Sequence, residues 1–150
     1  MKTYFIGLGG CGLKTVAEIS KRLKKDPNSN YAEDYAFTYI DTDMYTVNAL
    51  NETEIVIPAS DFVDMGPTVP LAIYNEALHT EHPNADSKRF LEWVIDQKPG
   101  HMILPNQPLT DGATAQRNVG RCGIYHYYDA IENELDRKIS RFSSITPNED

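Results

Sequence analysis

Long hydrophobic runs and cysteines are scarce in this 150-residue sequence. No apolar stretch approaches the ~20 residues that a membrane-spanning helix requires, and glycines interrupt the apolar N-terminus too early for a signal peptide. The only two cysteines, Cys11 and Cys122, cannot build a disulfide framework and favour two reduced thiols. These scarcities predict a cytoplasmic protein with no membrane partner.

Positive charge is also in short supply. The chain carries 14 lysines and arginines against 22 acidic residues, which gives a formal net charge of −8. A surface of this sign repels a phosphodiester backbone, so we expect no nucleic-acid partner. A small phosphorylated ligand is still compatible, because backbone amides bind phosphate without a basic patch.

Glycine, in contrast, is concentrated near the N-terminus, in the stretch GLGGCG at residues 7–12. Residues 4–8 have the character of a short buried strand, and apolar residues recur with helical spacing over residues 13–24. The glycines fit the pattern G-x-G-x-x-G between a strand and a helix, where free N–H groups and close backbone approach suit a phosphate. The alternative is a tight turn that binds nothing.

A second strand is predicted over residues 36–40, followed directly by Asp41, Thr42 and Asp43. Strand, glycine turn, helix and strand form a βαβ unit, whose crossover implies a parallel sheet. We expect a three-layer, Rossmann-like α/β fold with a mostly parallel sheet and the glycine loops at the C-terminal strand edges, where such sheets bind ligands. Asp41 follows Gly12 by 29 residues, later than the ~20 typical of NAD-binding folds, and no Walker G-K-[ST] closes the glycine run.

The middle of the chain is predicted to be less regular, and Phe90 and Trp93, at helical spacing, are predicted to lie in the core. One domain is expected over residues 1–142, followed by a polar tail over residues 143–150. The further elements are a third strand over residues 54–58, short helices over 71–79 and 87–95, and a long helix over 118–142.

A second loop, GATAQRNVGR at residues 112–121, precedes the long helix and provides another helix N-terminus. Arg117 and Arg121 lie about one helical turn apart. They could add charge to a bound phosphate or form an exposed face of the helix. The segment alone leaves both interpretations open.

The order of GLGGCG, IDTD and GATAQRNVGR before a long helix resembles the N-terminal half of the tubulin and bacterial cell-division GTPase superfamily. The chain looks closest to the divergent bacterial branch of tubulin-like proteins, and the resemblance covers residues 1 to about 140. It implies that GTP or GDP, with Mg²⁺, is the cofactor. It also implies self-association of the full-length protein into cytoskeletal filaments.

The resemblance further implies three groups of nucleotide-binding residues. The first group lines the first phosphate loop, the second approaches the nucleotide and its metal, and the third senses the terminal phosphate, with two arginines near by. In this order, they are Gly9, Gly10, Cys11 and Gly12; Asp41, Thr42 and Asp43; and Ala113, Thr114, Ala115 and Gln116 with Arg117 and Arg121.

Several features of the superfamily are missing before Asp150. The main phosphate cradle G-G-G-T-G-[ST]-G, the helix that contacts the base and the acidic loop for hydrolysis would all follow the long helix. We therefore expect an excised N-terminal piece whose GTPase activity belongs to a longer parent chain. We predict no catalytic residue in this chain and no metal site built from its side chains.

Two alternatives come from other functional classes. The glycine run with Asp41, Asp43 and Asn48 also resembles adenylating enzymes of the ubiquitin-activating type, which bind ATP. However, the arginine that normally follows this Asn and the zinc-binding CxxC pairs are both absent. The other alternative is a non-catalytic interaction module whose glycine loop is purely structural.

Overall fold

The computed structural model describes residues 2–53, 55–81, 85–94, 104–110, 112 and 117–144. The chain divides into two compact units. The sheet unit comprises residues 1–41, 45–63 and 129–150, and the helical unit comprises residues 42–44 and 64–128. No helix among the described residues is long and apolar enough to cross a membrane.

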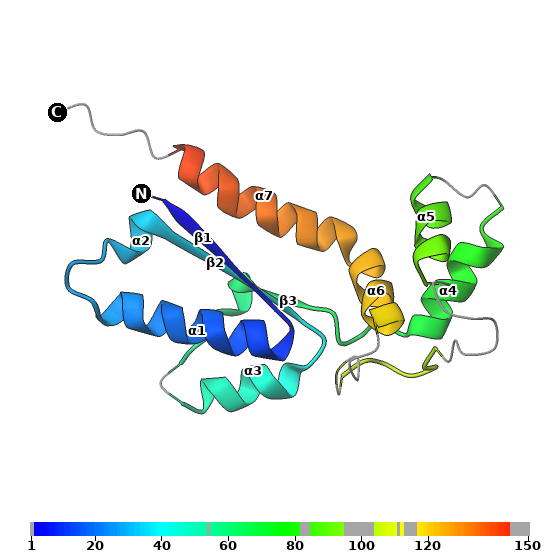
Figure 1. The fold of residues 1–150 in the computed structure, drawn as a ribbon, viewed down its shortest axis with the longest axis horizontal. Helices are drawn as coiled ribbons and strands as arrows, with labels where there is room; N and C mark the ends of the chain where they lie inside the picture. Colours follow the sequence, from blue (N-terminus) through cyan, green and yellow to red (C-terminus); the bar gives the residue numbers. More distant parts are fainter. Residues whose placement is uncertain are drawn as a thin grey trace. The chain divides into compact units, whose positions relative to one another are not determined.

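Most of the regular structure belongs to the sheet unit, and three helices belong to the helical unit (Figure 1). The sheet unit contains β1 (Thr3–Leu8), α1 (Gly9–Lys25), α2 (Tyr31–Asp34), β2 (Tyr35–Asp41), most of α3 (Met44–Asn51), a 3-10 turn (Ala59–Asp61), most of β3 (Phe62–Asp64) and α7 (Tyr128–Ser144). The helical unit contains α4 (Pro70–His79), α5 (Ala85–Val94) and α6 (Arg117–His126).

The sheet has the strand order β1-β2-β3, and β1 and β2 run parallel. Their register pairs Thr3 with Tyr35 at one end and Leu8 with Ile40 at the other. Each predicted strand over 4–8 and 36–40 is therefore present, extended by a residue at one end or both. The predicted βαβ unit with its parallel sheet is confirmed.

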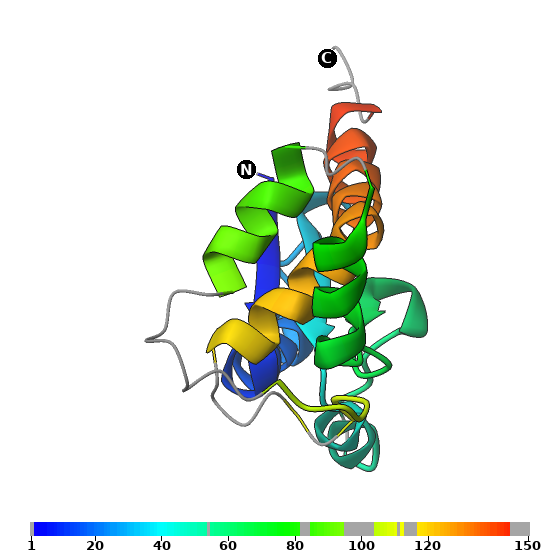
Figure 2. The ribbon, with the colours of Figure 1, turned by 90° about the vertical axis from the view of Figure 1, so that its right-hand side faces the viewer.

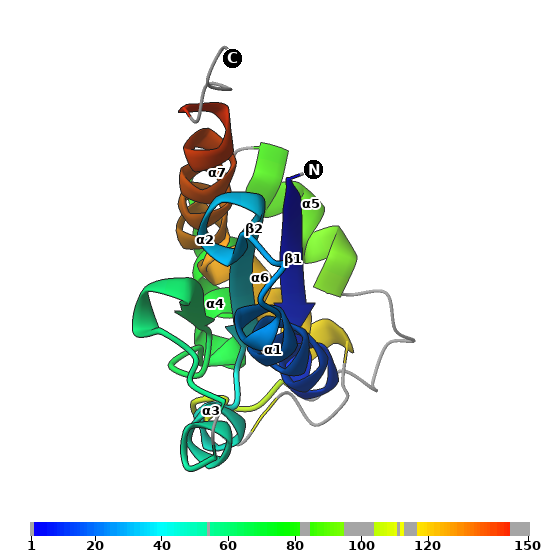
Figure 3. The ribbon, with the colours of Figure 1, turned by 90° about the vertical axis from the view of Figure 1, so that its left-hand side faces the viewer.

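Helix α1 covers one face of this sheet and packs against both β1 and β2 (Figure 3). It buries Leu13, Val16 and Ala17, the residues that its apolar periodicity turns toward the sheet. Tyr39 of β2 faces this side, and its burial raises the pKa of the phenol to about 12, although a hydrogen bond with Ser20 of α1 opposes the shift. The helix is thus fixed to the sheet by apolar packing and a buried hydroxyl contact.

Helix α7 covers the opposite face. Thr38, the neighbour of Tyr39, donates a hydrogen bond from its Oγ1 to Glu134 of α7 (3.2 Å), and the Tyr4 hydroxyl lies 2.7 Å from the same Oγ1. Successive side chains of a strand point to opposite faces, so α1 and α7 sandwich the sheet, as Figure 1 shows. The expected three-layer, Rossmann-like α/β fold is confirmed.

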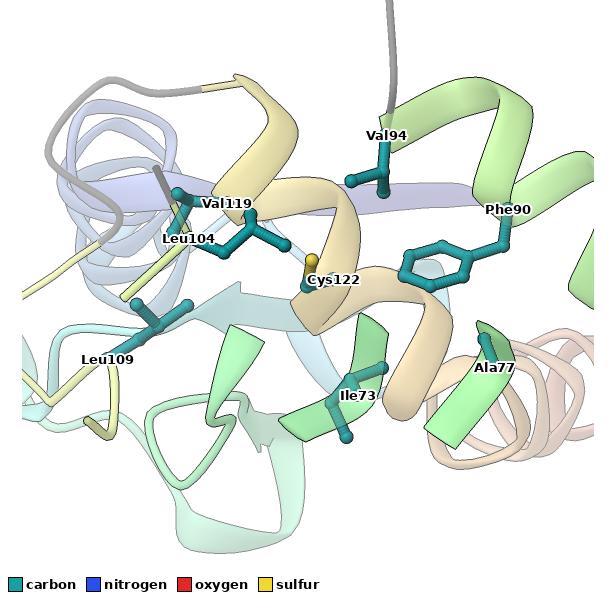
Figure 4. Close-up of a cluster of buried hydrophobic side chains, with 8 residues drawn as sticks. All are labelled: Ile73, Ala77, Phe90, Val94, Leu104, Leu109, Val119 and Cys122. Carbon is teal, nitrogen blue, oxygen red and sulfur yellow. The ribbon is translucent and has the colours of Figure 1, made fainter. Parts of the chain in front are cut away.

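The helical unit has its own core. Helices α4, α5 and α6 contact one another, and Figure 2 shows α6 between the other two. The Phe90 and Tyr125 rings stack at 4.0 Å between α5 and α6. The buried cluster, drawn in Figure 4, consists of Ile73, Ala77, Phe90, Val94, Leu104, Leu109, Val119 and Cys122. The predicted short helices over 71–79 and 87–95 correspond to α4 and α5, although the last residue of the second lies outside the described residues.

Two predicted elements are wrong. Residues 55–58 form no strand, and the third strand is β3, later in the chain. The Ile57 N–H donates a hydrogen bond to the Asn51 side chain (2.9 Å). This backbone group therefore does not pair with a neighbouring strand. The long helix over 118–142 is two helices, α6 and α7, separated by a turn at Tyr127, and they belong to different units.

The prediction for Trp93 is also wrong. Phe90 is buried at 2% exposure, but Trp93 is 54% exposed. The indole lies in the last turn of α5, where the guanidinium of Arg121 is stacked over it at 5.4 Å. Arg121 of α6 therefore covers one face of the Trp93 ring. The helical spacing between Phe90 and Trp93 had predicted that this ring lies in the core.

Candidate functional site

The turn from β1 into α1 depends on the absence of a side chain at Gly7. A Cβ atom on this buried residue would lie 2.9 Å from the Gly12 carbonyl oxygen and 3.1 Å from the Leu13 Cα. Both are backbone atoms of the first turns of α1, which cannot move aside as a flexible side chain could. Gly7 therefore allows the helix to begin directly against the strand, and Gly9, with φ of +66°, makes the reversal.

The N-cap residue of α1 makes no side-chain cap for the first turn of the helix. The helix begins at Gly9, four residues earlier than the apolar pattern predicted. Its N-cap residue, Leu8, has no side chain that can accept a hydrogen bond from the helix, and no acidic residue lies in the first turn. The first N–H groups of a helix have no intrahelical acceptor, and they carry a partial positive charge. This arrangement fits a phosphate group.

A carboxylate and a hydroxyl lie beside this first turn. The Cβ position of Gly10 is 3.9 Å from Asp41 Oδ2 and 3.9 Å from Thr46 Oγ1. Asp41 ends β2 and is only 6% exposed, and Thr46 belongs to α3. The sequence identified Asp41 but missed Thr46. Thr46 follows the DTD segment by three residues, and this proximity was the one signal that could have identified it. It was missed because the sequence did not predict α3.

The two residues after Asp41 belong to the helical unit. The Cβ of Asp43 lies 4.0 Å from the Cβ position of Gly112, in the loop that precedes α6. A Cβ on Gly66 would lie 2.8 Å from the Thr42 carbonyl oxygen, so this segment also packs closely against the loop after β3. Thr42 and Asp43 are thus held by two loops of the helical unit.

The loop that was expected to sense a terminal phosphate is only partly described. Ala113, Thr114, Ala115 and Gln116 lie outside the described residues, as does the side chain of Arg117, the first residue of α6. Arg121 donates a hydrogen bond to the Trp93 carbonyl oxygen and stacks on the Trp93 ring. Its guanidinium therefore contacts the C-terminal turn of α5, and a role in phosphate binding stays a prediction.

The two cysteines differ in environment. Cys11 is exposed in the first turn of α1. Cys122 is fully buried in the helical core, where burial raises the pKa of its thiol to about 11. Both are free thiols. Cys11 therefore provides a single reactive probe at the open helix terminus.

Metal ligation by side chains alone finds no support in the part of the chain that the structure describes, where no three His, Cys, Asp or Glu residues are grouped to hold an ion. Asp41 and Thr46 place a carboxylate and a hydroxyl beside the first turn of α1. A hard cation such as Mg²⁺ commonly binds through one or two carboxylates and completes its shell with phosphate oxygens and water. The oxygen ligands present fit that mode of binding.

Comparison with known families gives one match. The sequence model of a family described as "Tubulin like" matches residues 4–149, nearly the whole chain. Neither the curated proteins nor the solved structures provide a match. The matched range includes the glycine turn, the DTD segment and the loop before α6.

Proposed function

This chain belongs to the tubulin-like family, and from that premise we propose that it is the nucleotide-binding part of a bacterial, cytoplasmic, filament-forming protein that binds GTP or GDP at the first turn of α1. The observation that carries the proposal is the uncapped start of α1 beside Asp41. Family membership provides the reason to expect a guanine nucleotide rather than another phosphate ester. Self-association in a longer parent chain and GTP hydrolysis there are part of the same proposal.

The chain's own groups have distinct tasks in this proposal. The N–H groups of Gly9, Gly10 and Cys11 donate to phosphate oxygens, and Gly7 keeps the helix start close to the strand so that these donors are fixed. The Asp41 carboxylate would repel a phosphate placed directly against it. Asp41 and Thr46 would hold Mg²⁺, whose positive charge would offset this repulsion. Binding should therefore require both an open helix terminus and the divalent ion.

The test is isothermal titration of the chain with GTP, GDP and ATP, with Mg²⁺ or with EDTA. We expect GTP and GDP to bind more tightly than ATP, and EDTA to lower the affinity at least about tenfold, because the Asp41–phosphate repulsion is then uncompensated. ATP binding with pyrophosphate exchange would favour the adenylating enzyme instead. No binding at about 1 mM nucleotide would overturn the proposal for this chain and favour a structural glycine loop.

A matched pair of variants places the site. Cys11→Asp puts a carboxylate at the exposed edge of the first turn, where it satisfies the helix terminus but competes with phosphate. We expect unchanged or slightly higher stability and a loss of GDP affinity of at least about tenfold. Cys11→Ser, which adds no charge, should bind as the wild type does. Equal affinities of the two variants would place the nucleotide elsewhere.

A further inference from the structure

Three segments of the helical unit meet at Gly66, a buried residue in the loop after β3. A Cβ atom on Gly66 would lie 2.8 Å from the Thr42 carbonyl oxygen and 3.6 Å from the Thr110 Cα. Thr42 follows β2, and Thr110 lies in the loop before α6. The distance to Thr42 is shorter than an ordinary van der Waals contact of a Cβ atom, so only glycine fits here without a shift of the backbone.

The Asp64 side chain fixes the conformation of this loop. Its Oδ1 accepts a hydrogen bond from the Gly66 N–H (2.8 Å), two residues further along the chain, as in an Asx turn. The loop is also joined to the segment before α6, because the Leu109 N–H donates to the Thr68 carbonyl oxygen (3.1 Å). Gly66 is therefore held on both sides, directly against Thr42.

This contact lies one residue after the carboxylate that stands beside the first turn of α1. The pairing of β2 with β1 ends at Ile40, and Asp41 is the last residue of β2. The position of the Thr42 carbonyl constrains the backbone on the C-terminal side of Asp41, because the two residues are bonded to each other. A binding group has to be held within about 0.5 Å of its productive position. The contact between Thr42 and Gly66 therefore helps to set where the Asp41 carboxylate lies.

We propose that Gly66 and Asp64 are positioning residues for the Asp41 carboxylate in the Mg²⁺-dependent binding of nucleotide. The inference rests on the proposed function, and it assigns to that site a loop of the helical unit that acts through Thr42. Gly66 acts through the space that its missing side chain leaves, and Asp64 through the hydrogen bond that its oxygen accepts. The competing roles are a turn that serves folding alone and an Asp64 carboxylate that acts by its charge. The three roles predict different effects of substitution.

The test is calorimetric titration of the chain with GDP in Mg²⁺ and in EDTA, which gives the ratio of the two affinities. For the wild type we expect a ratio of at least about tenfold. Gly66→Ala displaces the Thr42 carbonyl and should lower the ratio to less than about threefold, by weakening binding in Mg²⁺. The affinity in EDTA should stay within about twofold of the wild type, because the N–H groups at the start of α1 are unchanged.

Asp64 provides a second and milder pair of variants. Asp64→Ala removes the acceptor of the Gly66 N–H and should lower the ratio as Gly66→Ala does. Asp64→Asn keeps an oxygen acceptor without the charge and should keep the wild-type ratio. Gly120→Ala, at a position with no atom within 4 Å of the new Cβ, is the matched control in the same unit and should also keep it. Urea unfolding checks that each variant is folded, and the Asp64 pair decides the matter if Gly66→Ala does not fold.

Four results would overturn the inference. Gly66→Ala and Asp64→Ala could keep the wild-type ratio, or they could lose affinity equally in both buffers, which would show a role in folding alone. Asp64→Asn could lose the ratio as Asp64→Ala does, which would show that the charge acts. The wild type could bind GDP equally in Mg²⁺ and in EDTA. In the first three cases the wild type still binds GDP and the proposed function stands, whereas a wild type that does not bind GDP overturns the proposed function and this inference together.

Discussion

Replacing Gly7 by alanine is expected to lower the free energy of unfolding by about 2–3 kcal/mol, toward the upper end of the usual cost of overpacking. The new Cβ would lie 2.9 Å from the Gly12 carbonyl oxygen, and backbone on both sides has to move to relieve the contact. Because that movement shifts the first turn of α1 away from β1, GDP binding should be lost as well. Urea unfolding followed by circular dichroism measures the first effect, and calorimetric titration measures the second.

Gly120→Ala is the matched control. Gly120 lies inside α6, and a Cβ there would have no atom within 4 Å. Alanine favours a helix over glycine by about 0.5–1 kcal/mol, so this variant should be slightly more stable and should bind GDP normally. If Gly7→Ala unfolds at the same urea concentration as the wild type, then the close packing of β1 and α1 does not require a glycine at position 7.

Lys138→Met is expected to cost about 3 kcal/mol of unfolding free energy, the lower end of the range for removing one partner of a buried ion pair. The Lys138 side chain is 4% exposed, and its Nζ lies 2.5 Å from Asp61 Oδ1 and 3.7 Å from Glu134 Oε1. Methionine keeps the length of the side chain but leaves two carboxylates without this cation. Arg137, 3.8 Å from Asp61, compensates in part and places the cost at the lower end.

Arg22→Met provides the comparison for an exposed pair. Arg22 is 78% exposed and pairs with Glu18 across one turn of α1. Such pairs contribute about 0.3–0.5 kcal/mol, and salt should weaken the contribution further. We expect the loss in Lys138→Met to be several times larger and nearly independent of salt. Equal losses for the two variants would show that Lys138 is not buried as described.

The βαβ unit could be predicted because its signals are local. Short apolar segments, a glycine turn and an amphipathic helix are properties of contiguous residues. The strands β1 and β2 lie within a residue of their predicted bounds, and α1 begins four residues earlier than predicted. The sequence also placed Gly7 and Asp41 near the ends of the two strands, where the structure has them. Local pattern therefore sufficed for the part of the chain that holds the open helix terminus.

The errors have tertiary causes. Residues 55–58 have the composition of a strand, but the backbone N–H of Ile57 finds its acceptor on Asn51 instead of on a neighbouring strand. Apolar residues continue through Tyr127 with helical spacing, so periodicity could not reveal that α6 and α7 belong to different units. Trp93 was assigned to the core by its helical spacing from Phe90, and nothing in the sequence shows that Arg121 covers the exposed indole ring.

The most direct test of nucleotide binding at the start of α1 is the alkylation rate of the exposed Cys11 with iodoacetamide at about pH 8. Cys122 should not react, because it is buried and its pKa is raised to about 11. We predict that saturating GDP with Mg²⁺ slows the Cys11 reaction at least about tenfold, and ATP much less, since a bound phosphate covers the first turn. An unchanged rate in saturating GDP would contradict the central claim.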